Sequence, residues 1–100
     1  MSETNYMSAI LTAAADCPAP VYGWQDEAAD AVSALVYAHH AYAAGRIDEA
    51  VYGEAIDEAC TLTRYAYNLA GQRYDAREEA CYLDLWRAVH AYAETCKVTA

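Results

Sequence analysis

The residue types best suited to metal binding and nucleophilic chemistry in this sequence are four cysteines and three histidines. The cysteines are Cys17, Cys60, Cys81 and Cys96. No two of them form the CxxC knuckle of a structural zinc site. Cys81 and Cys96 would lie about 22 Å apart on one helix, since each residue adds 1.5 Å. We therefore interpret the cysteines as small core residues. A metal site built from Cys60, one other cysteine and a histidine is the alternative.

The histidines show no catalytic or metal-binding spacing. They are His39, His40 and His90, and the residues three positions before them are Val36, Tyr37 and Arg87. The Glu-x-x-His pairs of a di-iron bundle are therefore missing, as are GxGxxG, P-loop and HExxH motifs. His39 falls on an apolar helical stripe, which favours a hydrogen-bonded core residue over a general base. We expect a protein that is not an enzyme, with no catalytic, cofactor-binding or metal-binding residue.

The elements that position these side chains are all predicted to be helices. Apolar residues repeat at spacings of three and four, which is typical of α-helices that pack nearly antiparallel. Proline at position 18 ends the first helix, and Gly45 and Gly71 end the next two. The predicted helices cover about residues 4–15, 25–44, 49–70 and 76–96. We expect a single all-α domain over residues 1–100, a compact antiparallel bundle of three long helices and a short amino-terminal one.

Each helix has a predicted core stripe. In the first helix it is Met7, Ile10, Leu11 and Ala14. In the second it is Ala28, Val32, Leu35, His39 and Tyr42. In the third it is Tyr52, Ala55, Ala59, Leu62, Ala66 and Leu69. In the fourth it is Tyr82, Leu85, Val89, Tyr92 and Cys96. Because Phe is absent, we expect Tyr and Trp to supply core volume.

The net charge of −9 is concentrated in the first two-thirds of the chain. Residues 1–63 hold ten acidic residues and one base, Arg46, whereas residues 64–100 hold five of each sign. This balance disfavours direct binding to nucleic acid or to an anionic membrane, because both are polyanions. It favours a basic protein surface as the partner.

Several carboxylates have a local structural explanation. Asp26, Glu27 and Asp48 lie at helix starts, where dipole and capping explain them, and Asp75 and Glu78 have capping-box spacing. Other acids lie past the first turn, and Glu54 and Glu58 are like charges four residues apart, which costs a few tenths of a kcal/mol. A solvated helix face remains the simple explanation for them.

An antiparallel pairing of the second and third helices would place these acids on one strip that also contains a tyrosine and a histidine. Tyrosine is enriched at protein interfaces. The predicted partner-binding residues are Asp26, Asp30, Tyr37, His40, Glu54, Asp57 and Glu58.

Two other binding hypotheses compete with this one. The stretch Arg64, Tyr65, Tyr67, Arg73, Tyr74 and Arg77 interleaves bases and aromatics, as in single-strand nucleic-acid binders. Three nearby acids and the global charge disfavour it. Alanine-rich stripes and many tyrosines instead favour a small helical adaptor or a self-associating structural subunit, so homo-oligomerisation stays open.

In its length, its acidity in residues 1–63, its helical pattern and its missing catalytic motif, the chain resembles the anti-CRISPR proteins that phages make. The resemblance implies an inhibitor that occupies a Lys/Arg-rich nucleic-acid-binding site on a host protein or nucleoprotein complex. No basic signal-peptide start and no run of about 20 apolar residues are present. Four cysteines without secretory context are typical of a reducing compartment. We expect a cytoplasmic protein, in the host cell if phage-encoded.

Overall fold

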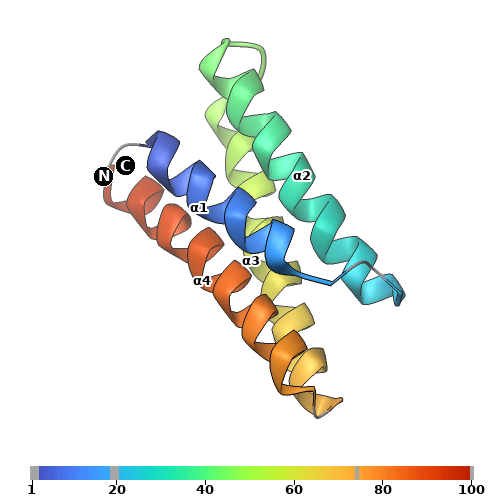
Figure 1. The fold of residues 1–100 in the computed structure, drawn as a ribbon. Helices are drawn as coiled ribbons and strands as arrows, with labels where there is room; N and C mark the ends of the chain where they lie inside the picture. Colours follow the sequence, from blue (N-terminus) through green and yellow to red (C-terminus); the bar gives the residue numbers. More distant parts are fainter. Residues whose placement is uncertain (1–2, 19–20, 74, 100) are drawn as a thin grey trace.

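The computed structural model describes residues 3–18, 21–73 and 75–99, and the side chains of residues 6–18, 21–73 and 75–96. These residues form four α-helices and no strand (Figure 1). The helices are α1 (Glu3–Asp16), α2 (Gly23–Ala43), α3 (Glu49–Gln72) and α4 (Ala76–Thr99). The predicted all-α bundle of three long helices and a short amino-terminal one is confirmed, with helix ends displaced by at most three residues.

Local capping sets the turns between the helices. Gly45 follows α2 with a positive φ of 76°, a conformation that favours glycine. The side chain of Asp48 accepts a hydrogen bond from the Val51 amide at 2.9 Å and so caps α3. Asp75 Oδ1 accepts from the amides of Arg77 and Glu78, both at 3.1 Å, at the start of α4.

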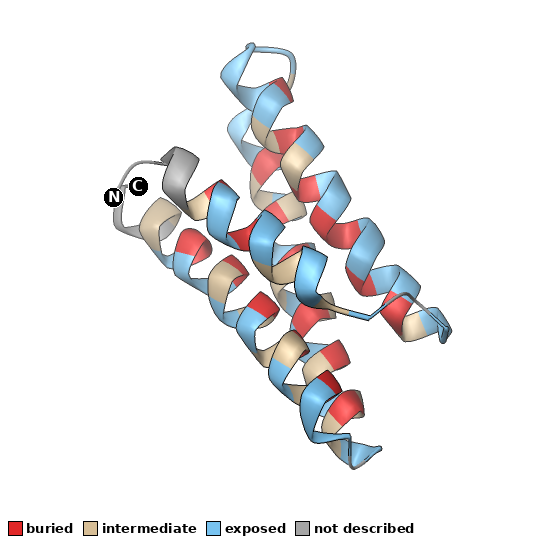
Figure 2. Ribbon diagram, viewed as in Figure 1, coloured by how far each residue is buried: buried red, intermediate tan, exposed pale blue. Residues whose placement is uncertain are grey.

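The packing of the helices is uneven. α3 packs extensively on both α2 and α4, and α1 packs on α4, whereas α1 and α2 touch only slightly. The buried residues form stripes on the inward faces of the helices (Figure 2). Ile10, Leu35 and Val89 are fully buried at 0% exposure and anchor three of the helices in one core. Within the described residues no helix is long and apolar enough to cross a membrane.

The core stripe of α3 differs from the prediction by one residue in three places. Ala55, Leu62 and Leu69 are only partly buried. The buried residues are Tyr52, Ile56, Ala59, Thr63, Ala66 and Ala70. α3 lies between α2 and α4. The side of α3 that these two helices contact decides which of its positions are buried. A hydrogen bond from Thr63 Oγ1 to the carbonyl of Ala59, 2.7 Å long, satisfies its hydroxyl in the core.

Two further expected core residues lie partly in solvent. Leu11 in α1 is 50% exposed and Tyr42 in α2 is 41% exposed. Leu11 is exposed because α1 lies on α4 and leaves its α2-facing side almost uncovered. Tyr42 lies near the end of α2, where its ring stacks on Tyr52 with the ring centroids 4.7 Å apart.

Candidate functional site

The face formed by α2 and α3 carries the predicted partner-binding residues. All seven side chains are exposed: Asp26, Asp30, Tyr37, His40, Glu54, Asp57 and Glu58. Asp30 of α2 and Glu58 of α3 line one shallow hollow together with Glu27. From the sequence, the helix dipole alone explained an acidic residue at position 27, Glu27. The structure thus brings carboxylates from two helices around a common depression.

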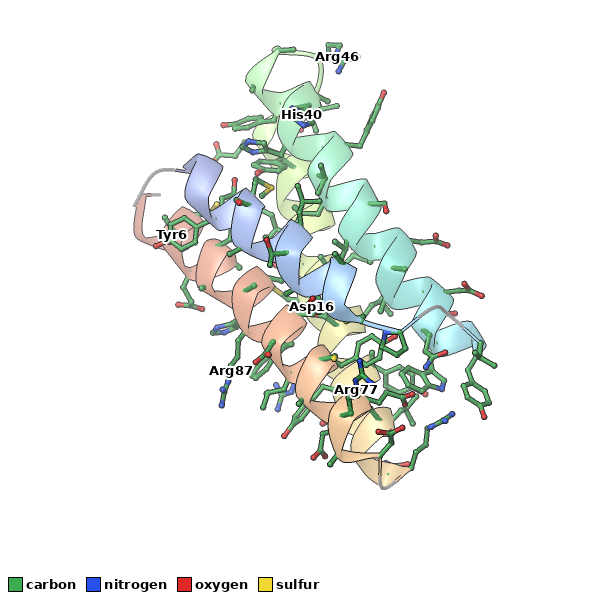
Figure 3. All side chains as sticks on the ribbon, viewed as in Figure 1. Tyr6, Asp16, His40, Arg46, Arg77 and Arg87 are labelled. Atoms are coloured by element: carbon green, nitrogen blue, oxygen red, sulfur yellow. The ribbon has the colours of Figure 1, made fainter. Side chains whose placement is uncertain are left out.

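The other predicted residues do not line this hollow. Tyr37 is 67% exposed, and the guanidinium carbon of Arg46 lies 5.8 Å from its ring centroid. Arg46 belongs to the turn between α2 and α3, at one end of the bundle (Figure 3). His40 lines a different hollow, between α1 and α2, with Met7 and Leu11. The structure therefore groups His40 with α1 rather than with the acids of α3.

The carboxylates on this face have no cationic partner among the side chains that the structure describes. Two ion pairs form among the described side chains, and both lie elsewhere in the molecule. They are Arg73–Glu78, with Nε 3.1 Å from Oε1, and His90–Glu94, with Nε2 3.5 Å from Oε1. Neither involves Glu27, Asp30 or Glu58. Their negative charge is therefore reduced only by solvent and salt, so it remains available to attract a basic surface.

A series of hydrogen-bonded side chains that the sequence did not predict lies at the same end of the bundle as Tyr42. His39 Nδ1 lies 3.1 Å from the hydroxyl of Tyr52, which hydrogen-bonds in turn to the hydroxyl of Tyr92. Burial, followed by the hydrogen bond to Tyr52, raises the pKa of Tyr92 well above its usual range. His39 was predicted to be a hydrogen-bonded core residue; the hydrogen bond is present, but the side chain is only partly buried. The sequence signal that could have indicated this bond is that the core stripes of α3 and α4 each contain a tyrosine, Tyr52 and Tyr92. A buried tyrosine hydroxyl needs a hydrogen-bond partner.

Cys17 lacks the lowered pKa of an activated nucleophile. Burial is the main cause that raises the pKa of Cys17 to about 12, and the neighbouring Cys81, Asp16 and Asp84 add to the shift. A reactive cysteine needs the opposite shift, since the thiolate is the nucleophile. Among the side chains of residues 6–18, 21–73 and 75–96, no group of three His, Cys, Asp or Glu could hold a metal ion.

Three side chains of the interleaved stretch, Arg64, Tyr67 and Arg73, contact residues of the protein outside that stretch. Arg64 lies over the Trp86 ring at 5.7 Å, and Tyr67 stacks on the same indole. Arg73 lies over the Tyr22 ring at 4.2 Å while pairing with Glu78. Stacking on nucleic-acid bases would require these internal contacts to open. Tyr74, part of the same predicted stretch, lies outside the described residues.

Comparisons with protein-family models, with curated proteins and with solved structures find no match to this chain.

Proposed function

We propose that this chain is a non-enzymatic protein-binding inhibitor that acts in the cytoplasm of a host cell. Its α2/α3 acidic surface, defined as Asp26, Glu27, Asp30, Tyr37, Glu54, Asp57 and Glu58, would occupy a basic nucleic-acid-binding site on a host protein or nucleoprotein complex. That is the mode of action implied by the resemblance to anti-CRISPR proteins. The observation that carries the proposal is the hollow between α2 and α3. Asp30 and Glu58 meet there across two helices, joined by Glu27.

The physical basis is electrostatic complementarity. Like charges that lie close together on a helix surface destabilise the isolated fold by a few tenths of a kcal/mol per pair. A target rich in Lys and Arg removes this repulsion and gains charge-assisted contacts. Complementary potentials also raise the association rate, and this gain falls with ionic strength. The exposed ring of Tyr37 adds a large contact area at low entropic cost.

The test uses two charge-reversal variants of equal net charge. Asp30→Lys with Glu58→Lys changes the hollow, whereas Glu49→Lys with Glu94→Lys changes two exposed acids outside the α2/α3 acidic surface. Each immobilised protein captures host-lysate components at low salt, and rising salt elutes them. The proposal requires that a nucleic-acid-binding complex elutes at moderate salt from the wild type and from the Glu49→Lys, Glu94→Lys variant. Equal capture by the two variants would reject the α2/α3 acidic surface as the binding surface.

A helical adaptor or self-associating subunit is the second candidate. The observation that favours it is the incompletely covered side of α1, where Leu11 is half exposed. Such an apolar surface gives association that tolerates salt, because hydrophobic contacts are not screened. Sedimentation of the chain at low and high salt separates the two candidates. A stable homo-oligomer at both salt concentrations would favour the second.

A further inference from the structure

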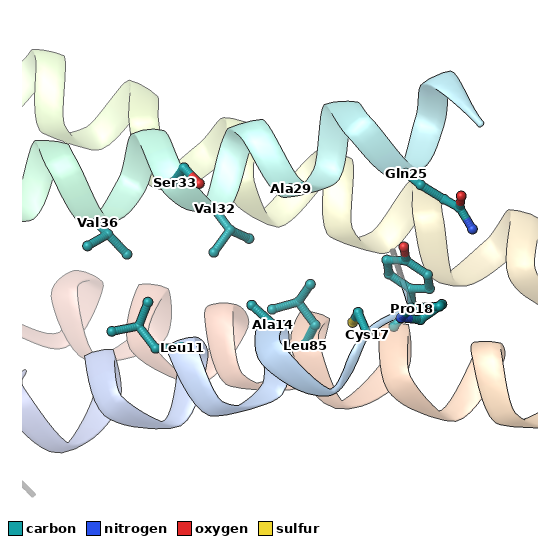
Figure 4. Close-up of a pocket in the computed structure, with 11 residues that line it drawn as sticks. Leu11, Ala14, Cys17, Pro18, Gln25, Ala29, Val32, Ser33, Val36 and Leu85 are labelled. Atoms are coloured by element: carbon teal, nitrogen blue, oxygen red, sulfur yellow. The ribbon is translucent and has the colours of Figure 1, made fainter. Parts of the chain in front are cut away.

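α1 and α2 leave an apolar groove between them, on a different side of α2 from the acidic hollow. Two hollows form this groove and share Leu11 and Val36 as lining residues. One runs from Leu11 toward Pro18 and has Leu85 of α4 among its lining residues (Figure 4). Tyr82 of α4 lines it as well. The other continues from Leu11 toward His39 and His40. We call the joined hollows the α1/α2 groove.

The dimensions of the α1/α2 groove suit a helix. Its α2 wall extends from Gln25 to His40. At 1.5 Å per residue this is about 22 Å, or roughly four helical turns. Val32, Leu85 and Leu11 provide aliphatic surface along it, and Leu11 is 50% exposed there. Amphipathic helices bind such grooves through side chains at i, i+3, i+4 and i+7.

Acidic side chains surround one end of the groove. Tyr82 and Cys17 line that end. Burial is the main cause that raises the pKa of Tyr82 to about 12, and carboxylates that include Asp26 contribute. Asp84 contributes in the same way to the raised pKa of Cys17. Asp26 directly follows the lining residue Gln25, and Asp84 directly precedes the lining residue Leu85, so both carboxylates add negative charge beside the groove.

Nearby bases compensate this negative charge only in part. The Arg73 guanidinium pairs with Glu78, which removes that carboxylate from the balance. Arg77 lines a neighbouring hollow with Asp16 and Cys81. Asp26 and Asp84 are exposed and have no ion pair among the described side chains. They are thus the carboxylates best able to attract a cationic residue of a ligand.

We propose that the α1/α2 groove binds an amphipathic helix of a partner protein, with aliphatic residues along Leu11 and Val36 and with Lys or Arg beside Asp26 and Asp84. A second copy of this chain fits less well. It carries a net charge of −9, and its α1 and α2 helices contain no Lys or Arg. The groove lies apart from the α2/α3 acidic surface except for Asp26, so the proposal does not depend on the proposed function.

The experiment uses a defined probe. A fluorescein-labelled peptide of about 16 residues, with leucine and lysine in helical spacing, spans about 24 Å as a helix. Its affinity is measured by fluorescence anisotropy. Leu11→Ser should weaken binding at least about tenfold, because leucine loses its apolar contact. Val51→Ser is the matched control, since Val51 is 47% exposed on α3 and should leave affinity unchanged.

Charge is tested with neutral substitutions of equal number. Asp26→Asn with Asp84→Asn should lower the affinity for the peptide and reduce the salt dependence of its binding. Asp57→Asn with Glu58→Gln removes the same net charge on α3 and should have a smaller effect. This control separates the groove from the proposed function, because binding to the α2/α3 acidic surface would make the α3 pair the more damaging one.

Amide chemical shifts of the isotope-labelled protein locate the bound peptide. Shifts confined to residues 7–18 and 25–40 and the facing part of α4 support the proposal. No binding by the wild type, equal binding by the two serine variants, or shifts centred on residues 54–58 would each overturn it. A wild-type dimer that Leu11→Ser converts to a monomer would also overturn it, because the groove occupant would then be a second copy.

Discussion

Gln25, near the start of α2, donates a hydrogen bond from Nε2 to the carboxylate of Glu78 in α4, 3.3 Å away and 53 residues later in the chain. The same side chain accepts hydrogen bonds at Oε1 from the amides of Val21 and Tyr22, at 2.6 and 3.0 Å. Arg73, just after α3, pairs with the same carboxylate. Gln25 and Glu78 are both buried. One amide group thus holds the segment before α2 against the start of α4, close to the end of α3.

Replacing this glutamine should destabilise the fold. Gln25→Ala leaves one oxygen of the buried Glu78 carboxylate without its partner, which costs about 1–3 kcal/mol, and it removes the bonds to the Val21 and Tyr22 amides, which water can replace. Urea denaturation measures the free energy of unfolding. Gln72→Ala, at an exposed position of α3, is the matched control and should change it by less than about 0.5 kcal/mol. Equal losses in the two variants would contradict the buried role of Gln25.

Two of the leucines that the sequence placed in the core should respond differently to truncation. Leu85 is 2% exposed in the centre of the core, so Leu85→Ala should cost about 2–5 kcal/mol. Leu62 is only partly buried beside the α2/α3 hollow, so Leu62→Ala removes fewer contacts and should cost about half as much or less. Thermal and urea unfolding of both variants provide the comparison. A larger loss of stability for Leu62→Ala than for Leu85→Ala would instead support the α3 core stripe predicted from the sequence.

The sequence predicted the helices well because their ends are fixed by local signals. Pro18, Gly45 and Asp48 act on residues within one turn of themselves, so no tertiary information is needed. The buried face of α3 was predicted less well. Leu62 and Thr63 are neighbours about 100° apart on the helix, and the positions of α2 and α4 decide which of them is covered.

The site residues divide in the same way. Exposure of Asp30 and Glu58 followed from their charge and spacing, and their meeting followed from an antiparallel pairing of helices. Burial of Glu78 could not be inferred, because its capping-box spacing with Asp75 gave a sufficient local explanation. Its actual partner, Gln25, is remote in sequence. The groove beside Leu11 also depends on tertiary packing, since α1 packs on α4 rather than on α2.

Cys17 should react slowly with alkylating agents. With a pKa of about 12, instead of about 9, the thiol is almost fully protonated near neutral pH. Mass spectrometry after iodoacetamide treatment should show a rate at pH 8 at least about 100-fold below that of a small thiol. The rate should keep rising with pH until the protein unfolds. A plateau near pH 9 would show that Cys17 titrates like an ordinary thiol.

The same shift predicts a loss of stability in alkaline solution. The folded state keeps the Cys17 proton to higher pH than the unfolded state, so unfolding releases a proton above pH 9. The contribution is fully present below about pH 9 and is lost as the pH rises toward 12. Urea unfolding at several pH values should therefore show a smaller alkaline decline for Cys17→Ala. Tyr82, whose pKa is also about 12, contributes a decline of its own that persists in this variant.

The hydroxyl of Tyr52 should stabilise the fold through its link to Tyr92. Tyr52→Phe removes the bridge between His39 and Tyr92, and Tyr92 is 1% exposed, so water cannot replace the lost bond without entering the core. We expect a loss of about 1–3 kcal/mol in the free energy of unfolding. Tyr65→Phe is the control, because Tyr65 is 51% exposed on α3 and should have almost no effect.

A double-mutant cycle tests whether the two tyrosines act together. Tyr92→Phe alone should also destabilise, and the double variant should lose less than the sum of the single losses, with a coupling of about 0.5–3 kcal/mol. The raised pKa of Tyr92 adds a second readout. The folded protein should retain at least two tyrosines that stay protonated well above pH 10, Tyr82 and Tyr92, and Tyr92→Phe should remove one of them. Additive losses together with an unchanged tyrosinate titration would show that the two hydroxyls are energetically independent.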